Sequence, residues 1–548
     1  MSDYNRKSKL KSKHTEPFFS GVLVLTLSNI LVKAVGLLFK IPMNYIVGDI
    51  GMGYYNAAYS IYTFFYMLST AGLPVAISIM VSEARGKGNT AYIRQILKTA
   101  LLLFLIIGII GSGLMFFGAQ RLSEWIGAPP AAVCVLAIAP SMFFVCMTGA
   151  LRGYFQGCQK MLPTAISQVI EALCKMVFGI LLAVWAIRNA LQPEMIAAYA
   201  VCGLTIGTAF SMMYLIIVKC FERREEPALQ VHIPSPDTKA LLKRFAAISL
   251  PVTLSASVIS LTNMIDAVLI QRLLQNGGMS QEMATTVYGN YTSLAVPLFN
   301  LPPVFVYPIA YSIVPLIAKI RVSDKREEAG RIMISSLRIA SIIGLPCALG
   351  LAAFAEPILS LFYRAESAAS AAPLLTLLAP SSFFVCLLAI TNSILQAIGK
   401  ADKPVYAMVI GGAVKIVSSH VLIKHFGMLG TPISTFLCYL TVTVISLFYV
   451  FRYTGVSLPA VNLFLKPLLS SGICVTTALF CFYLTKHSIM KKQAVLLSIF
   501  IAVLTYIPLV LRTNILTKED LNYLPHKEKI ISLLLKWHML VEKDSKQI

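Results

Sequence analysis

The sequence predicts an all-α, polytopic membrane protein with about fourteen transmembrane helices. We expect two parallel six-helix lobes followed by two C-terminal helices. Of the 548 residues, 57% are hydrophobic and only 13% are charged, whereas about 25% are charged in ordinary soluble proteins. Apolar runs of about 20 residues recur between short polar stretches, and six of them are repeated later in the chain. This pattern excludes a soluble multidomain enzyme.

The apolar runs define the expected spans, near 18–46, 53–81, 96–117, 131–151, 163–187, 195–218, 245–271, 287–318, 332–354, 373–397, 404–423, 428–451, 463–485 and 493–511. If the N-terminus is inside, 34 of the 46 Lys and Arg residues fall in the loops, tails and flanks of that side. Such a bias predicts a multi-pass protein with both termini in the cytoplasm. The net charge of +22 is thus explained by topology, and we expect no nucleic-acid partner.

Two other features bear on class and cofactors. The first apolar run is too long for a signal peptide, and no small-residue cleavage site follows it, so we expect it to remain as the first span. The eleven cysteines are scattered and form no Cys-x-x-Cys pair, which predicts neither a disulfide framework nor a metal site. We expect no cofactor and no catalytic residue.

An internal repeat sets the domain organisation. Ala139–Cys146 reads APSMFFVC and Ala379–Cys386 reads APSSFFVC, and this register of 240 continues to Lys160 and Lys400. An even number of spans separates the copies, so the repeat is parallel, an arrangement that transporters use for two lobes around a midplane site. The expected parts are a basic tail (1–17), an N-lobe (18–218), a linker (219–244), a C-lobe (245–451), two further spans (452–512) and a C-terminal tail (513–548). The tail contains an amphipathic stretch that either lies on the inner leaflet or packs on the loops.

The first span carries ionisable residues far from either membrane surface. Asn29, Lys33, Lys40 and Asn44 share one helical face with Gly36. Lys33 lies about 22 Å into its span, and a lysine at a span centre costs about 2.5–3.5 kcal/mol to insert. We therefore expect Lys33 to line a cavity. Lys40 is nearer the outer end, and it has the alternative of reaching the interface.

Further ionisable residues lie in the fifth, seventh and eleventh spans. Glu171 and Lys175 are one helical turn apart, and they either line the cavity or neutralise each other. Lys415 has the register of Lys175 in the second copy. Asp266 could pair with Arg272 or with a lysine across the cavity. Four lysines against two acids make the expected cavity cationic, which favours an anionic solute.

The second span carries Tyr55, Tyr59, Tyr62 and Tyr66 at helical spacing. A stripe of this kind is usually formed by packed side chains. In a transporter cavity the same rings could instead stack on sugars.

These motifs resemble a known family. Gly72–Ala84, which reads GLPVAISIMVSEA, follows a first span reading VKAVGLLFKIPMNYIVGDIGMGYYN. Together they resemble the stage V sporulation protein B and YtgP branch of the polysaccharide transporters. This branch belongs to the multidrug/oligosaccharidyl-lipid/polysaccharide (MOP) exporter superfamily, which also contains the MurJ lipid II flippases.

The resemblance implies alternating-access flipping of an undecaprenyl-pyrophosphate-linked cell-wall precursor, most simply lipid II, in a bacterial inner membrane. Lys33 matches the basic residue of the S-R-V-L-G motif of MurJ-like relatives, and Lys40 sits one position past a second one. Their basic residue in the second span has no counterpart, since Phe65-Tyr66 stands there. The implied substrate sites are Asn29, Lys33, Lys40, Glu171, Lys175, Asp266, Arg272 and Lys415. The expected partners are the lipid-linked glycan and membrane lipids, and the working expectation is a monomer.

Four alternatives to this interpretation exist. The strongest is a cation-coupled multidrug exporter of the same superfamily, or a flippase for another lipid-linked polysaccharide unit. A non-transporting sporulation scaffold is another. A lipid-linked glycosyltransferase would need acidic residues and a sizeable outer loop, whereas the outer loops here are short and show no nucleophile–base set.

Overall fold

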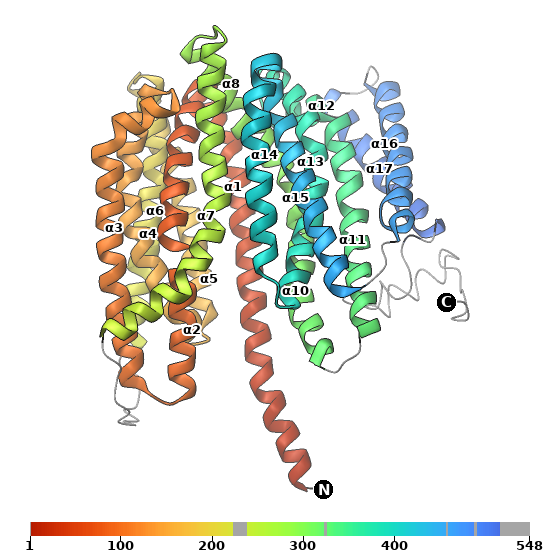
Figure 1. Ribbon diagram of the computed structural model, residues 1–548. Coiled ribbons are helices and arrows are strands. Elements are labelled where there is room, and N and C mark those ends of the chain that lie inside the picture. Colours follow the sequence, from red (N-terminus) through yellow and green to blue (C-terminus); the bar gives the residue numbers. More distant parts are fainter. Residues whose placement is uncertain are drawn as a thin grey trace. The chain divides into compact units, whose positions relative to one another are not determined.

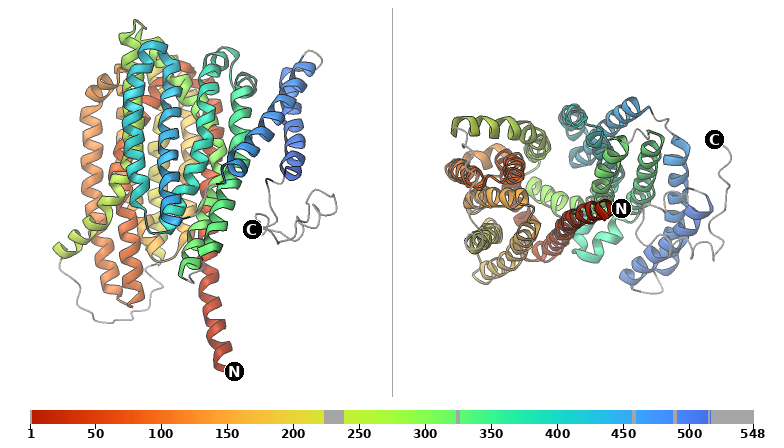
Figure 2. Two further views of the ribbon diagram at one scale, coloured as in Figure 1. Left: turned by 45° about the vertical axis from the view of Figure 1, so that its right-hand side comes forward. Right: turned by 90° about the horizontal axis from the view of Figure 1, so that it is seen from below.

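The computed structural model describes residues 2–222, 238–322, 326–455, 459–486, 490–513 and 515. They form long helices joined by short turns (Figure 1, Figure 2). The middle of the predicted linker and the amphipathic stretch of the C-terminal tail lie outside these residues. The chain divides into two compact units, Met1–Gly289 and Asn290–Ile548, and each is described by itself.

The first unit contains α1 to α8. The bounds are α1 Ser2–Thr70, α2 Leu73–Gly86, α3 Thr90–Ile126, α4 Ala132–Gly157, α5 Met161–Arg188, α6 Pro193–Glu222, α7 Thr238–Asn276 and α8 Gln281–Asn290. The label α1 covers two helices that meet at Gly48, whose φ of 76° and ψ of 169° are not helical. Glycine adopts this conformation without strain. The first two predicted spans are the two arms of α1.

The second predicted span does not run unbroken to residue 81. Its helix ends at Thr70, and α2 begins at Leu73 with a proline in its first turn, a position where the missing N–H of Pro74 costs nothing. Gly72, between them, lies so close to the carbonyl of Ser249 in α7 that a Cβ would overlap it. The break therefore lets α7 approach the backbone.

The second unit contains α9 to α17. The bounds are α9 Val296–Phe299, α10 Leu301–Val322, α11 Arg326–Ala353, α12 Ala355–Phe362, α13 Ala365–Ala397, α14 Asp402–Phe426, α15 Gly430–Thr454, α16 Lys466–Thr485 and α17 Lys491–Arg512. The predicted span 287–318 is broken at Asn300, where the two pieces meet at 42°. Pro302 and Pro303, which follow at once, lack the N–H groups that would continue the helix.

The residues that the structure describes contain ten helices long and apolar enough to cross a membrane, or eleven when the bent pair at Asn300 is one span. Two of the ten, Leu27–Gly86 and Asp402–Thr454, each cover two predicted spans. The 39-residue α7 is the remaining predicted span. The fold is therefore polytopic and helical, as predicted, while the count of fourteen stays a prediction.

The internal repeat is visible in backbone geometry. Helix α4 is followed by Gln159 (φ 59°), and α13 is followed by Gly399 (φ 76°), at the same register. In each copy the N–H of the next lysine, Lys160 or Lys400, bonds to the carbonyl five residues back, at 2.9 Å and 2.8 Å. This is the same left-handed helix ending in both copies.

Packing against the motif helices repeats as well. A Cβ on Gly108 of α3 would meet Cys146 at 3.2 Å, and a Cβ on Gly344 of α11 would meet Cys386 at 3.3 Å. In each of α4 and α13, 61% of the membrane window is buried, a larger share than in any other candidate span of the described chain. The repeated octapeptide is thus the centre of each copy, where small residues allow helices to approach closely.

The loops of the first unit gather at two ends. At one end Arg85 donates to the carbonyl of Cys158, Arg244 pairs with Glu83, and Lys160 lies 2.5 Å from Glu222. At the other end the Arg272 guanidinium donates to the carbonyl of Trp125 at 2.7 Å. The loops assigned to one membrane side by their charges therefore meet one another within this unit.

Candidate functional site

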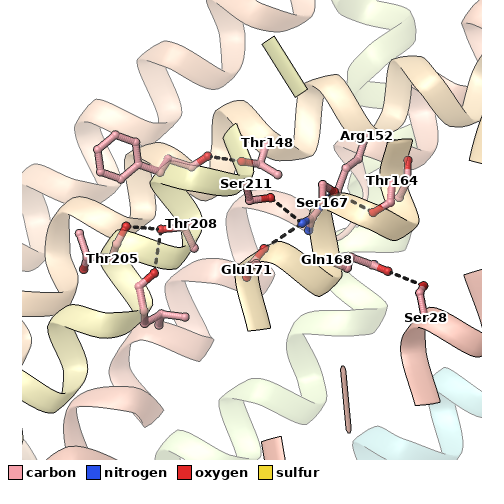
Figure 3. Close-up of polar contacts among 12 residues, drawn as sticks. Ser28, Thr148, Arg152, Thr164, Ser167, Gln168, Glu171, Thr205, Thr208 and Ser211 are labelled. Carbon is pink, nitrogen blue, oxygen red and sulfur yellow. Dashed lines mark hydrogen bonds and ion pairs between the residues drawn. The ribbon is translucent and has the colours of Figure 1, made fainter. Parts of the chain in front are cut away.

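A half-buried ionic cluster joins three helices of the first unit (Figure 3). Arg152 of α4 donates from Nη2 to Oε2 of Glu171 on α5 at 2.8 Å and to Oγ of Ser211 on α6 at 3.0 Å. Its Nε donates to Oγ of Ser167 at 2.9 Å. The side chains of Arg152 and Glu171 are 14% and 21% exposed, and both serines are buried. The guanidinium is thus fixed by three acceptors, one of them charged.

Sequence reasoning missed Arg152. The predicted fourth span ended at residue 151, which placed this arginine in a cytoplasmic flank, but α4 continues to Gly157. Glu171 was expected to line the cavity or to neutralise Lys175, and its ion pair is with Arg152. The end of α4 is the feature that could have revealed it. If the helix is extended to Gly157, Arg152 lies inside it, and a basic residue buried there needs an acidic partner.

The polar face of the first span lies beside α5. Ser28 donates to Oε1 of Gln168 at 3.3 Å and to the carbonyl of Leu25 at 2.9 Å. Farther along, a Cβ on Gly179 would lie 3.1 Å from the ring of Phe39. The two contacts show that the first arm of α1 runs parallel to α5. Lys33 lies between them along α1, and its side chain is exposed on the unit, as is that of Asn29.

Lys175 faces aromatic rings. Its Nζ lies 4.9 Å from the centroid of the Tyr59 ring and 5.5 Å from that of Phe39. Cation–π contacts of this kind favour a charged ammonium. The half-buried Lys40, next to Phe39 in sequence, is near enough to Lys175 for the two charges to repel each other. Two of the predicted site lysines are thus brought together.

The tyrosine stripe forms a continuous row of rings. Neighbouring centroids are 6.2 Å apart for Tyr55 and Tyr59, 5.8 Å for Tyr59 and Tyr62, and 5.8 Å for Tyr62 and Tyr66. Tyr55 and Tyr62 are buried, while Tyr59 and Tyr66 keep partial exposure. Each ring of the row is therefore packed against a neighbour, and Tyr59 and Tyr66 keep part of their surface exposed.

The remaining predicted site residues are placed differently. Lys415 is 6% exposed and shares the buried face of α14 with Gly411 and Ser419, where Ser419 donates to Ser434 of α15 at 2.8 Å. Asp266 is half-buried on α7. Arg272 donates to the carbonyls of Glu124 and Trp125, so it satisfies backbone groups at the end of α3.

The second unit contains an apolar cavity of about 390 Å³. It is lined by α10, α11, α12, α16 and α17, through residues that include Phe305, Leu351, Phe354, Val475 and Ile507. Its wall is almost wholly hydrocarbon and aromatic, which suits an apolar chain. Within the described residues, no group of three or more His, Cys, Asp or Glu is placed to hold a metal ion.

Comparison with known proteins gives two family matches. The model described as polysaccharide biosynthesis protein matches residues 18–321, and the MatE model matches residues 251–421. Both families belong to the MOP superfamily.

Two relatives come from Bacillus subtilis (strain 168). Stage V sporulation protein B is 26% identical over 73% of this chain and 76% of its own length. The lipid II flippase MurJ is 24% identical over 80% and 83%. Among solved structures, that of the lipid II flippase MurJ in an inward closed conformation has a TM-score of 0.69 at 16% identity. It covers 89% of this chain and 98% of its own. A lipid II flippase is thus among both the sequence relatives and the fold relatives.

Proposed function

Because this chain belongs to the polysaccharide biosynthesis protein family, we propose that it is a flippase for a polyprenyl-pyrophosphate-linked glycan. In this proposal the lipid-linked glycan moves from the inner to the outer leaflet of the bacterial cell membrane by alternating access. Lipid II is the glycan we propose first, because MurJ, a lipid II flippase, is among the relatives.

The observation that carries the proposal is the charge balance of the first unit. Within its spans, Lys33 and Lys40 on α1, Lys175 on α5 and Arg152 on α4 contribute four positive charges. Two acids, Glu171, which pairs with Arg152, and Asp266 on α7, leave a balance of two positive charges. Charges of this kind are costly within a bilayer unless a bound ligand or an oppositely charged side chain compensates them. A pyrophosphate supplies matching negative charge, and charge-assisted bonds to it are strong where solvent screening is weak.

The rest of the substrate has surfaces to match. The exposed parts of Tyr59 and Tyr66 offer aromatic surface to sugars. The apolar cavity of the second unit, with a volume of about 390 Å³, offers hydrocarbon walls to part of a prenyl chain. Each surface is proposed from its own unit alone. In this proposal the substrate-binding residues of the first unit are Asn29, Lys33, Lys40 and Lys175. Glu171 is engaged by Arg152, Arg272 by backbone carbonyls, and neither is proposed to contact the substrate.

The test is depletion of the protein in its own host, followed by analysis of lipid-linked intermediates in each leaflet. We expect lipid II to accumulate on the inner side. Accumulation of a different lipid-linked glycan would support a flippase whose substrate is that glycan. Unchanged precursor pools contradict the proposal.

A second candidate function is cation-coupled drug export, which the MatE match to residues 251–421 favours. An exporter of cationic drugs is expected to have a net acidic cavity, whereas the spans of the first unit have three lysines and Arg152 against two acids, Glu171 and Asp266. Altered drug sensitivity with normal precursor pools would support this candidate.

A further inference from the structure

The contacts of Glu171 point to a role for Arg152, which rests on the proposed function. We propose that Arg152 is a positioning residue that engages Glu171. By doing so it leaves Lys175, together with Lys40, as a cationic subsite for a phosphate group of the substrate.

The first step concerns the acid. Glu171 and Lys175 are one turn apart on α5, the spacing at which a carboxylate and an ammonium pair along a helix. The carboxylate is held instead by Arg152 from the neighbouring helix α4 at 2.8 Å. Ser167 and Ser211 accept further hydrogen bonds from the guanidinium, so its orientation is fixed. Arg152 thus holds the carboxylate that would otherwise be available to Lys175.

The second step concerns the lysines. The ammonium of Lys175 lies against the rings of Tyr59 and Phe39, which attract a cation without neutralising it. Lys40, one position beyond Phe39, adds a like charge close by. Two ammonium groups that repel each other are stabilised by an anion of more than one charge. A phosphate or pyrophosphate fits this requirement better than a carboxylate does.

The internal repeat provides a comparison within the chain. At the register of 240, Lys415 corresponds to Lys175, while Asn392 and Gly411 correspond to Arg152 and Glu171. The acid and the arginine are therefore present together in one copy and replaced together in the other. This is the pattern expected if the arginine serves to offset the acid beside the lysine.

The experiment measures binding of undecaprenyl pyrophosphate to the purified full chain in nanodiscs by native mass spectrometry, with uncharged undecaprenol as the reference. We expect Arg152→Gln to weaken pyrophosphate binding at least tenfold, because the released Glu171 turns to Lys175. The double variant Arg152→Gln/Glu171→Gln should return to within about threefold of wild type. Glu171→Gln alone should bind at least as tightly as wild type.

Two controls separate this role from a structural one. Lys160→Gln breaks another ion pair at the end of α4, with Glu222, and should leave binding unchanged. Arg152→Lys, which keeps the charge, replaces Arg152→Gln if the latter does not fold, and it should bind nearly as wild type does. The inference is overturned if the double variant, folded to the same melting temperature, binds as weakly as Arg152→Gln. Wild type with no preference for pyrophosphate over the prenol would contradict the proposed function itself.

Discussion

At the scale of single residues, the buried charges of the first unit are of two kinds. Arg152 and Glu171 compensate each other across 2.8 Å, and they hold α4 to α5. Lys175 lies against aromatic rings, and Lys40 lies near it. The first kind links two helices and, in the role proposed for Arg152, keeps the Glu171 carboxylate from pairing with Lys175. The second kind is explained best by a ligand.

Among the lysines proposed to bind the substrate, Lys33 is the one whose loss we expect to reduce transport most clearly. We expect Lys33→Ala to insert and fold, because the change removes a residue that costs about 2.5–3.5 kcal/mol in a span centre. It should nevertheless fail to restore growth of a flippase-depleted strain. Lys33→Arg, which keeps the charge and adds a bidentate donor, should retain much of the activity. The measurement is growth at matched expression, with the exposed Lys87→Ala as control. Full growth with Lys33→Ala would make this lysine structural.

The sequence could indicate which lysines lie deep in the spans but not what they contact. Lys33, Lys40 and Lys175 are recognisable because apolar residues surround them in sequence. Arg152, the partner of Glu171, lies 19 residues earlier on another helix. No helical spacing along the sequence links these two residues. Lys415, predicted to be equivalent to Lys175, is packed on a helix face with Gly411 and Ser419. Side-chain direction depends on tertiary packing, which sequence periodicity does not specify.

At the scale of elements, long apolar runs predicted the helices well and their breaks poorly. The breaks at Gly72 and Asn300 lie inside runs that hydropathy alone joins. Their chemical signals, Leu-Pro after Gly72 and Pro302-Pro303 after Asn300, are visible in the sequence. A proline can also sit inside a membrane helix, as Pro140 and Pro380 do in α4 and α13. Proline alone therefore does not decide whether a span continues.

The matching helix endings at Gln159 and Gly399 predict opposite changes in thermal stability when each residue is replaced. Gln159 holds a φ of 59°, which costs a non-glycine residue about 1 kcal/mol. Gln159→Gly should therefore raise the apparent melting temperature in detergent by roughly 1–3 °C. Gly399→Ala should lower it by a similar amount, because Gly399 has a φ of 76°. Gly113→Ala, in open space within α3, is the control, and it should not lower stability. A fall in stability with Gln159→Gly would contradict the account.

The close contact of α5 and α6 at Gly203 gives a further stability prediction. A Cβ on Gly203 would lie 2.5 Å from the backbone of Gly179 and 2.7 Å from the carbonyl of Lys175. Gly203→Ala should therefore push the two helices apart and cost about 1–3 kcal/mol of unfolding free energy. Thermal unfolding in detergent measures this, with Gly472→Ala, which meets nothing within 4 Å, as the matched control. Equal melting temperatures for the two variants would show that α6 can move at no cost.

At the scale of the whole molecule, the apolar runs predicted the polytopic helical fold, while the sidedness inferred from the charges and the two six-helix lobes stay predictions. The match of Ala139–Cys146 with Ala379–Cys386 marks the most buried helix of each copy. The division into compact units was not predictable from it, since the first unit extends to Gly289 and includes α7. That division depends on contacts such as the pair of Glu83 with Arg244, which join residues far apart in sequence.

Orientation in the membrane is the last prediction. Lys87 is exposed at the end of the first unit where Arg85, Cys158 and Arg244 meet other loops. Asn189 is exposed just after α5, whose 28 residues span about 42 Å from the Lys160 end. The bias of Lys and Arg predicts that the Lys87 end is cytoplasmic.

A membrane-impermeant thiol reagent applied to intact cells should therefore label Asn189→Cys and miss Lys87→Cys. Permeabilised cells should label both. The exposed native Cys220 must first be replaced by serine, because it lies near the Lys87 end of α6 and would label after permeabilisation. The reverse pattern in intact cells would overturn the inside assignment. Since Ser28 contacts Gln168 near the start of α5, the same reversal would place the N-terminus outside.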